Sequence, residues 1–303
     1  MVERGQGRAH GPLRNAISWA RACPRSGDAL LGGQRSGVSR KRGGRPNERP
    51  MTGEISEAVR FVAMAAREIR DGEVCFVGIG VPSLAAMSAK RTHAPDAVLI
   101  YESGAVDADP PVPPLSTGSP SVVANTTMVT SCLGVFAMLQ QGRFDVGLLS
   151  GAQVDRYGNL NSTVLGGATS KRKVRLVGSG GAHDIALLAR EVLIMMPHDP
   201  RRFVSRVDYV TTPGLRTRES GLASTHARGR GPRCLITPRA RFTFETGELT
   251  LEALADGVAE SEALEGFSWT VARAAHVRRL PPIETSLAHT AAHLLELWGR
   301  DAI

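Results

Sequence analysis

Glu102 lies between an apolar run and a Ser-Gly pair, a position from which a carboxylate could carry covalent chemistry. Residues 97–101 have the composition of a buried strand, so the Glu102 side chain should project from the strand's carboxyl end. An ionised, partly desolvated carboxylate at such a place can act as a nucleophile. The ordinary alternative is an acid that caps a following turn or helix. Position alone leaves the two interpretations equal.

Glycine marks four loops, each of which follows an apolar run. The loops are Gly78-Ile-Gly80, Glu102-Ser103-Gly104, residues 150–159, and Gly178-Ser179-Gly180-Gly181-Ala182. In an open parallel sheet, the loops after the carboxyl ends of the strands form the ligand crevice. We therefore expect the four loops to share one site.

The last of these loops stands between a predicted strand and a predicted helix. Glycines let the backbone approach a ligand closely, and unpaired amides there could bind an anion or an oxyanion. A tight turn without a ligand is the alternative. Gly78 and Gly80 could likewise cradle a phosphate, and Glu102 lies far enough downstream to suggest a dinucleotide site. That motif lacks its third glycine, where Ser83 stands, and it leaves the two later loops unexplained.

Polar side chains in the loops offer further candidates. Gln153 and Asn159 could hydrogen-bond a substrate carbonyl or the amides of pantetheine, or Asp155, Gly158 and Asn159 could simply make the turn. His183 and His198 are each isolated in the sequence, so a structural role is favoured for both. We expect no metal site.

The elements that must position these residues alternate between apolar strands and amphipathic helices. A helix is predicted from the N-cap Thr52 to Gly72, and others over residues 83–90, 128–140, 182–189 and 285–298. Strands are predicted at 74–77, 97–101, 146–149, 174–177 and 192–196, with a possible hairpin of 234–236 and 241–245. Short, continuously apolar strands between helices are typical of an open α/β fold, with a mostly parallel sheet covered by helices on both faces. Residues 211–233 are expected to form a long surface loop.

The net charge of +8 belongs to the first 50 residues, which hold eleven Lys and Arg against three acids. The remaining residues carry 26 of each sign, so nothing in the folded part indicates nucleic acid. We expect residues 1–51 to be a disordered basic tail and residues 52–303 to be one domain. The four cysteines are scattered, which favours a reducing cytoplasm, and no apolar run is long enough to span a membrane.

Taken together, the segments resemble the β subunits of the family I CoA-transferases, the group that includes glutaconate CoA-transferase. The resemblance extends from about residue 55 to residue 240. The matching segments are residues 77–82, 89–96, 100–104, 151–162, 178–182, 194–196, 201–203 and 208–214.

This resemblance implies that Glu102 is the nucleophile, that it forms a mixed anhydride and then a glutamyl-CoA thioester, and that Gly180 and Gly181 supply the oxyanion hole. It also implies that CoA is a substrate, that no cofactor is permanently bound, and that a homologous α subunit completes an α2β2 enzyme. Acyl-CoA hydrolysis or C–C bond cleavage on the same scaffold is the nearest alternative. A sugar-phosphate-binding regulatory module is a second one, and a nicotinamide-dependent dehydrogenase is a distant third.

Overall fold

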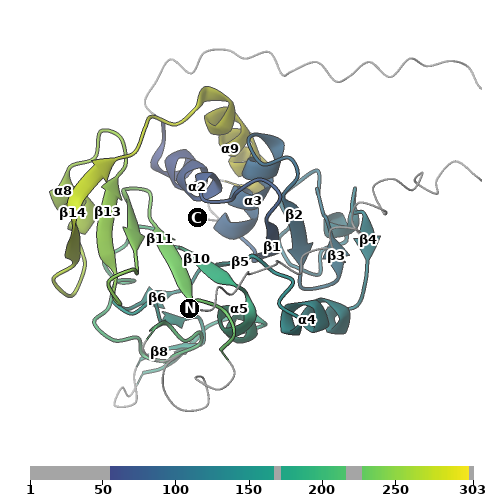
Figure 1. Cartoon of the computed structure of the whole chain (residues 1–303), viewed down its shortest axis with the longest axis horizontal. Helices are drawn as coiled ribbons and strands as arrows, with labels where there is room; N and C mark the ends of the chain where they lie inside the picture. The colour runs from purple at the N-terminus through teal and green to yellow at the C-terminus, as the bar shows by residue number, and fades with distance from the viewer. Residues whose placement is uncertain (1–54, 167–171, 216–226, 300–303) are drawn as a thin grey trace, which may run out of the picture. The chain divides into compact units, whose positions relative to one another are not determined.

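Ten strands form one mixed sheet (Figure 1). The computed structural model describes residues 55–166, 172–215 and 227–299, and all of them lie in one unit, Ile55–Ile303. In spatial order the strands are β14 (Ala272–Arg279), β13 (Thr250–Leu254), β12 (Ala240–Thr243), β11 (Pro232–Ile236), β10 (Glu191–Met195), β5 (Val146–Leu149), β1 (Val74–Val77), β2 (Val98–Tyr101), β3 (Ala105–Val106) and β4 (Met128–Val129).

The middle of the sheet, β11-β10-β5-β1-β2, is parallel. Every residue of β1, β2 and β5 is buried, because helices cover both faces of these strands. β3 and β4 continue from β2 in antiparallel fashion, and β12 forms an antiparallel hairpin with β11. These observations confirm the predicted open α/β fold and the predicted hairpin.

Helices lie on both faces of the sheet (Figure 1). On one face α2 (Glu57–Arg67), α3 (Val81–Arg91) and α9 (Thr285–Trp298) pack against one another, and on the other lie α4 (Cys132–Gln140) and α5 (Ala182–Leu188). The cap of α2 is Ser56, whose hydroxyl accepts a hydrogen bond from the Val59 amide at 3.3 Å. The predicted cap, Thr52, lies outside the described residues.

Two predicted elements differ from the structure. Residues 128–140, predicted as one helix, are divided into β4 and α4 because Ser131 caps the helix through a 3.1 Å hydrogen bond from the Gly134 amide. Residues 174–177, predicted as a buried strand, contain β9 (Val174–Arg175), which pairs with β8 (Val164–Leu165) outside the main sheet. Val174 and Val177 are exposed. An apolar run alone does not distinguish such a hairpin from a core strand.

Smaller elements connect the main ones. β6 (Gln153–Val154) and β7 (Leu160–Asn161) form a two-stranded sheet after β5, η1 (Pro120–Val123) is a 3₁₀ turn before β4, and α8 (Glu260–Leu264) precedes β14. The predicted surface loop 211–233 is packed at its beginning, where Thr211 and Thr212 are buried. Residues 216–226 of this loop lie outside the described ranges.

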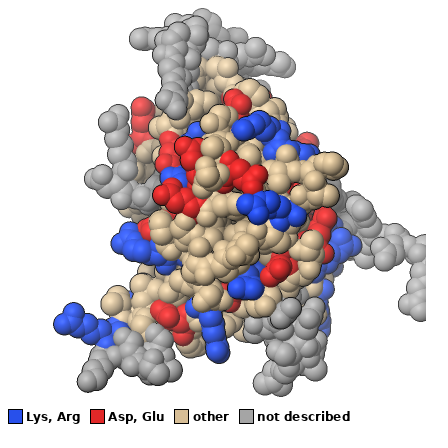
Figure 2. Space-filling model, turned by 90° about the vertical axis from the view of Figure 1, so that its left-hand side faces the viewer, with Lys and Arg blue, Asp and Glu red and all other residues tan. Residues whose placement is uncertain are grey.

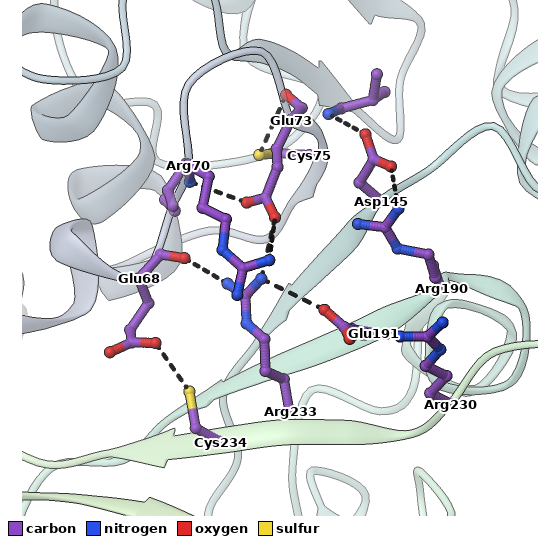
Figure 3. A network of polar contacts seen from close by, with 12 residues as sticks. Glu68, Arg70, Glu73, Cys75, Asp145, Arg190, Glu191, Arg230, Arg233 and Cys234 are labelled. Carbon is purple, nitrogen blue, oxygen red and sulfur yellow. Dashed lines mark hydrogen bonds and ion pairs between the residues drawn. The ribbon is translucent and has the colours of Figure 1, made fainter. Parts of the chain in front are cut away.

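Acidic side chains at the amino ends of the parallel strands are joined to arginines (Figure 3). The buried Arg233 guanidinium lies 3.0 Å from Glu73 Oε1 and 3.5 Å from Glu191 Oε2, and it also donates to the Glu68 carbonyl oxygen. Asp145 pairs with Arg190 at 3.1 Å. Burying the Glu73 and Asp145 carboxylates is tolerable because each has a cationic partner.

The edge strand β14 carries arginines and no acidic residue, and two of these arginines pair with glutamates of neighbouring elements. Arg273 pairs with Glu260, and Arg278 pairs with Glu252. Figure 2 shows this end of the molecule, where Lys or Arg and Asp or Glu side chains are interspersed. Charged side chains on an open edge discourage pairing with another strand.

The three cysteines in the described ranges are free. Cys75 and Cys234 are buried, and burial raises the pKa of both thiols, so they act as small apolar side chains. Cys132 is exposed. No helix among the described residues is both long and apolar enough to cross a bilayer.

Candidate active site

Glu102 leaves the sheet at the carboxyl end of β2 and sits in a tight turn. The amide of Gly104 donates to the carbonyl oxygen of Tyr101 at 3.0 Å, so Glu102 and Ser103 are the two central residues of the turn. Tyr101 itself is fully buried, and its hydroxyl lies 2.7 Å from Ser83 Oγ. Burial raises the pKa of Tyr101 to about 12. The residue before Glu102 is therefore fixed in the core, while Glu102 itself is half-buried.

Only glycine fits the end of this turn. Gly104 has a φ of +121°, and a Cβ there would collide with the Thr130 carbonyl oxygen. The two backbones also pair, because the Thr130 amide donates to the Gly104 carbonyl oxygen at 2.8 Å. Ser103 Oγ donates to the Thr117 carbonyl oxygen. The Glu-Ser-Gly segment is thus held by residues of the following loop.

The carboxylate of Glu102 faces the loop of Gly180 and Gly181. A Cβ built on Gly180 would lie 3.7 Å from Oε2 and 4.0 Å from Oε1 of Glu102, and one on Gly181 would lie 3.6 Å from its Cδ. Glu102 makes no hydrogen bond or ion pair with any described residue. Two predicted site segments that are far apart in the sequence therefore meet around an unpaired carboxylate.

Within this loop the amides fall into two groups. The Gly178 amide donates to the Ser162 carbonyl oxygen and the Ala182 amide to that of Ser179, each at 2.9 Å. The amides of Gly180 and Gly181 have no acceptor among the described residues. The Ser179 amide also has no acceptor there, but of these three residues Gly180 and Gly181 are the ones shown to lie beside Glu102.

Phe136 of α4 is a residue that the sequence did not single out. Its Cζ would lie 2.5 Å from a Cβ on Gly181, so the ring packs directly against the glycine backbone. Its ring also meets that of Phe76 edge-on, with centroids 5.9 Å apart. From the sequence alone, an aromatic residue in an apolar helix could equally pack in the core or contact the site, so Phe136 could not be identified.

The Gly78–Gly80 loop leaves the sheet beside Glu102, because Val77 pairs with Tyr101 in the parallel register. A Cβ on Gly78 would lie 2.9 Å from the Leu148 carbonyl oxygen, and Gly80 has a φ of +82°. The ring of Trp298, at the end of α9, comes within 3.6 Å of a Cβ built on Gly80. This loop forms part of the same edge, as predicted from its position.

Gln153 and Asn159 are placed differently from the other candidates. Both are buried. Gln153 donates to Asp208 Oδ2 at 3.0 Å and accepts from Asn161 Nδ2 at 2.8 Å. Asn159 donates to Asp155 Oδ2 at 2.8 Å and accepts from the Gly214 amide at 2.7 Å. Their polar atoms are satisfied within the loops, so the turn-forming alternative describes them better than substrate binding.

The two histidines also have internal partners. His183 Nδ1 lies 3.2 Å from the Thr211 carbonyl oxygen. His198 Nε2 lies 3.0 Å from that of Glu265, its ring packs near Phe203 and Phe267, and burial lowers its pKa. In the part of the chain that the structure describes, no group of three or more His, Cys, Asp or Glu is arranged to hold a metal ion.

Apolar side chains are exposed on the elements that surround Glu102. α4 contains no charged residue, yet only Val135 and Leu139 of its nine residues are buried. Leu133 is 79% exposed, and Val129 of the neighbouring β4 is 62% exposed. A helix that is apolar on all sides is normally buried. This surface, formed by β4 and α4, is contiguous with the site because Phe136 contacts Gly181 and Thr130 contacts Gly104.

Comparison with known proteins gives one consistent answer. The sequence model of the family described as Coenzyme A transferase matches residues 59–223. The chain is 41% identical to the B subunit of 3-oxoadipate CoA-transferase of Pseudomonas knackmussii over 74% of this chain and 87% of that protein. It is 33% identical to the B subunit of glutaconate CoA-transferase of Acidaminococcus fermentans over 72% of this chain and 85% of that protein.

The solved structures agree with the sequence comparison. The crystal structure of glutaconate coenzyme A-transferase from Acidaminococcus fermentans superposes with a TM-score of 0.68 at 27% identity, covering 82% of this chain and 94% of the other. The fold, the matched segment and the identity to two B subunits all lead to the same conclusion. The chain is a β-type member of the coenzyme A transferase family.

Proposed function

We propose that this chain is the nucleophile-bearing subunit of an enzyme that moves CoA from an acyl-CoA to a free carboxylate, with Glu102 as the group that becomes acylated. The observation that carries the proposal is the position of the unpaired Glu102 carboxylate against the free amides of Gly180 and Gly181. A carboxylate nucleophile divides one difficult exchange into easier steps.

In the first step a Glu102 oxygen attacks the thioester carbonyl carbon, the C–S bond breaks, and the CoA thiolate leaves. The product is a mixed anhydride of Glu102 and the acyl group. The thiolate then attacks the Glu102 carbonyl carbon and releases the donor acid as its carboxylate, which leaves a glutamyl-CoA thioester. An acceptor carboxylate reverses both steps, so CoA leaves on the new acid and Glu102 is regenerated.

Each of these steps passes through a tetrahedral oxyanion. The Gly180 and Gly181 amides are the candidates to bind it, because they have no acceptor among the described residues and lie beside the carboxylate. Preorganised donors of this kind are worth roughly 3–4 kcal/mol of transition-state stabilisation each. CoA serves as a substrate, and the proposal includes no permanently bound cofactor.

A companion α subunit is part of the proposal. The relatives are named as B subunits, and the surface formed by β4 and α4 exposes apolar side chains next to Glu102. A companion seated there would bury Leu133 and exclude water from the acylated glutamate, which an anhydride requires. An α2β2 assembly and a cytoplasmic location remain predictions from the sequence.

The test is trapping of the intermediate on the co-purified two-subunit complex. After incubation with an acyl-CoA, hydroxylamine should convert Glu102 to a hydroxamate and borohydride should reduce the thioester, both visible as a mass change in the peptide that contains Glu102. The modification should be absent from Glu102→Gln. A complex that consumes acyl-CoA without modifying Glu102 would contradict the transferase and favour the hydrolase or C–C bond-cleaving alternative.

A further inference from the structure

The hairpin of β8 and β9 leads directly into the glycine loop beside Glu102. Arg175 pairs with Val164, the Leu176 amide donates to the Thr163 carbonyl oxygen, and the Gly178 amide donates to that of Ser162, the last two at 2.9 Å. The extended run from Lys173 to Val177 therefore ends at Gly178. Its direction is fixed by backbone pairing rather than by its own side chains.

One face of this run is both cationic and apolar. Side chains alternate along an extended strand, so Lys173, Arg175 and Val177 share one face. Lys173 and Arg175 are exposed, and Val177 is 99% exposed. Neither cation forms an ion pair with a described residue, whereas Arg233 and Arg241, for example, are paired with glutamates.

The order of these side chains matches the order of groups in CoA. The molecule has phosphates at one end, an apolar geminal dimethyl group near them, and a thiol at the far end of the pantetheine arm. Along the chain the cations come first, Val177 follows, and Gly180 and Gly181 reach the carboxylate that would attack the thioester. Arg175 and Gly180 can lie at most about 18 Å apart, which is within reach of an extended CoA molecule.

We propose that Lys173 and Arg175 bind the phosphates of CoA and that Val177 supports the start of its pantetheine arm. This inference rests on the proposed function, because it assumes that the thioester lies at Glu102. Lys and Arg are the usual partners of phosphate, and their contribution at an exposed site falls as salt is added. The hairpin thus belongs to the CoA site, although it lies outside the main sheet.

The experiment compares two acyl donors with the co-purified complex: the acyl-CoA and the matching acyl-pantetheine, which has the same thioester but no phosphates. In the Lys173→Gln, Arg175→Gln double variant we expect KM for the acyl-CoA to rise roughly fivefold to thirtyfold, as for two lost exposed charge contacts. The KM for acyl-pantetheine should not change. Raising the salt concentration should increase KM for acyl-CoA in the wild type more than in the double variant.

Arg273→Gln with Arg278→Gln is the matched control, since it removes the same charge from β14, at the opposite edge of the sheet from Glu102. The two hypotheses fail differently. If the double variant keeps the wild-type KM for acyl-CoA and its salt dependence, while Glu102 is still acylated, the phosphate site is wrong and the transferase stands. If neither donor acylates Glu102 in the wild type, the proposed function fails, and the phosphate site fails with it.

Discussion

The acidic residues at the two ends of the parallel sheet differ in whether they have a cationic partner. At the amino end, Glu73, Asp145 and Glu191 are each joined to an arginine (Figure 3). At the carboxyl end, Glu102 has no partner among the described residues and faces glycine backbone. Pairing makes an acid contribute to stability and removes its reactivity. An acid left unpaired at the end of a strand is available for chemistry, and this contrast, rather than burial alone, distinguishes Glu102.

The largest effect is expected from Glu102→Gln. CoA transfer should fall by at least about a thousandfold, since the variant lacks the proposed nucleophile. Its thermal midpoint should stay close to that of the wild type, because the side chain makes no bond that the change would break. Steady-state transfer kinetics and a thermal melt measure the two quantities. A large loss of stability in this variant would show that Glu102 stabilises the fold, as the paired acids at the amino end do, and would contradict the proposed difference between the two ends of the sheet.

At the opposite end, Arg233→Met should act on stability. Removing this cation leaves the buried Glu73 carboxylate with only the mostly exposed Arg70 beside it, at 3.9 Å, which should cost roughly 3–5 kcal/mol in the free energy of unfolding. Urea unfolding of the chain measures this change in the free energy of unfolding. Arg230→Met is the control, since the Arg230 side chain is 74% exposed and its pair with Glu191 should contribute little.

A double variant sharpens the same point. If the penalty in Arg233→Met arises from the unpaired carboxylate, then Glu73→Gln combined with Arg233→Met should be less destabilised than the sum of the two single variants. Simple additivity would show that Arg233 acts through packing instead.

Gly181→Ala should have a smaller effect, mainly on turnover. The added methyl group would meet Phe136 Cζ at 2.5 Å, so the ring or the Gly181 backbone beside Glu102 must shift. We expect kcat to fall roughly tenfold to a hundredfold, less than for loss of a complete oxyanion donor. Adding Phe136→Leu should recover part of the loss by making room. If kcat does not recover, the loss arises from a change in the residue 181 backbone rather than from the contact with Phe136.

The smallest effect concerns pH. The pKa of Tyr101 is raised to about 12 by burial, above the ordinary value of 10. A raised folded-state pKa means that this stabilisation is complete below pH 10 and is lost as the pH rises toward 12. In a tyrosinate absorbance titration, the difference between wild type and Tyr101→Phe should therefore develop mainly above pH 10. A difference that is complete by pH 10 would show that Tyr101 is not held in the core.

Much of the fold was predictable because the central strands are apolar at every position. β1 and β5 have the predicted limits, and α9 begins and ends where its periodicity indicated. The exposed β9 and the division of residues 128–140 were not predictable. In both regions apolar side chains lie on the surface of the chain. A hydrophobic pattern indicates only that these side chains are apolar. It does not indicate whether they pack in the core of this chain or against another molecule.

The site was predictable only in part. Glu102 and the glycine loops each follow a predicted strand, so the sequence placed them at one edge of the sheet. The structure brings Glu102 together with Gly180 and Gly181. Gln153 and Asn159 have the residue types of a binding site, but the structure satisfies their polar atoms with loop partners. Which polar group stays free depends on tertiary contacts that no local pattern specifies.

The contact of Trp298 with the Gly80 position has a consequence for synthesis of the protein. A ribosome makes β1, β2 and the Glu102 turn before it makes α9, so the emerging chain exposes Glu102 before the loop beside it is covered. Helix α9 then packs on α2 and α3 and brings the indole ring against that loop. This edge is therefore covered only after α9 has been translated and has folded onto α2 and α3.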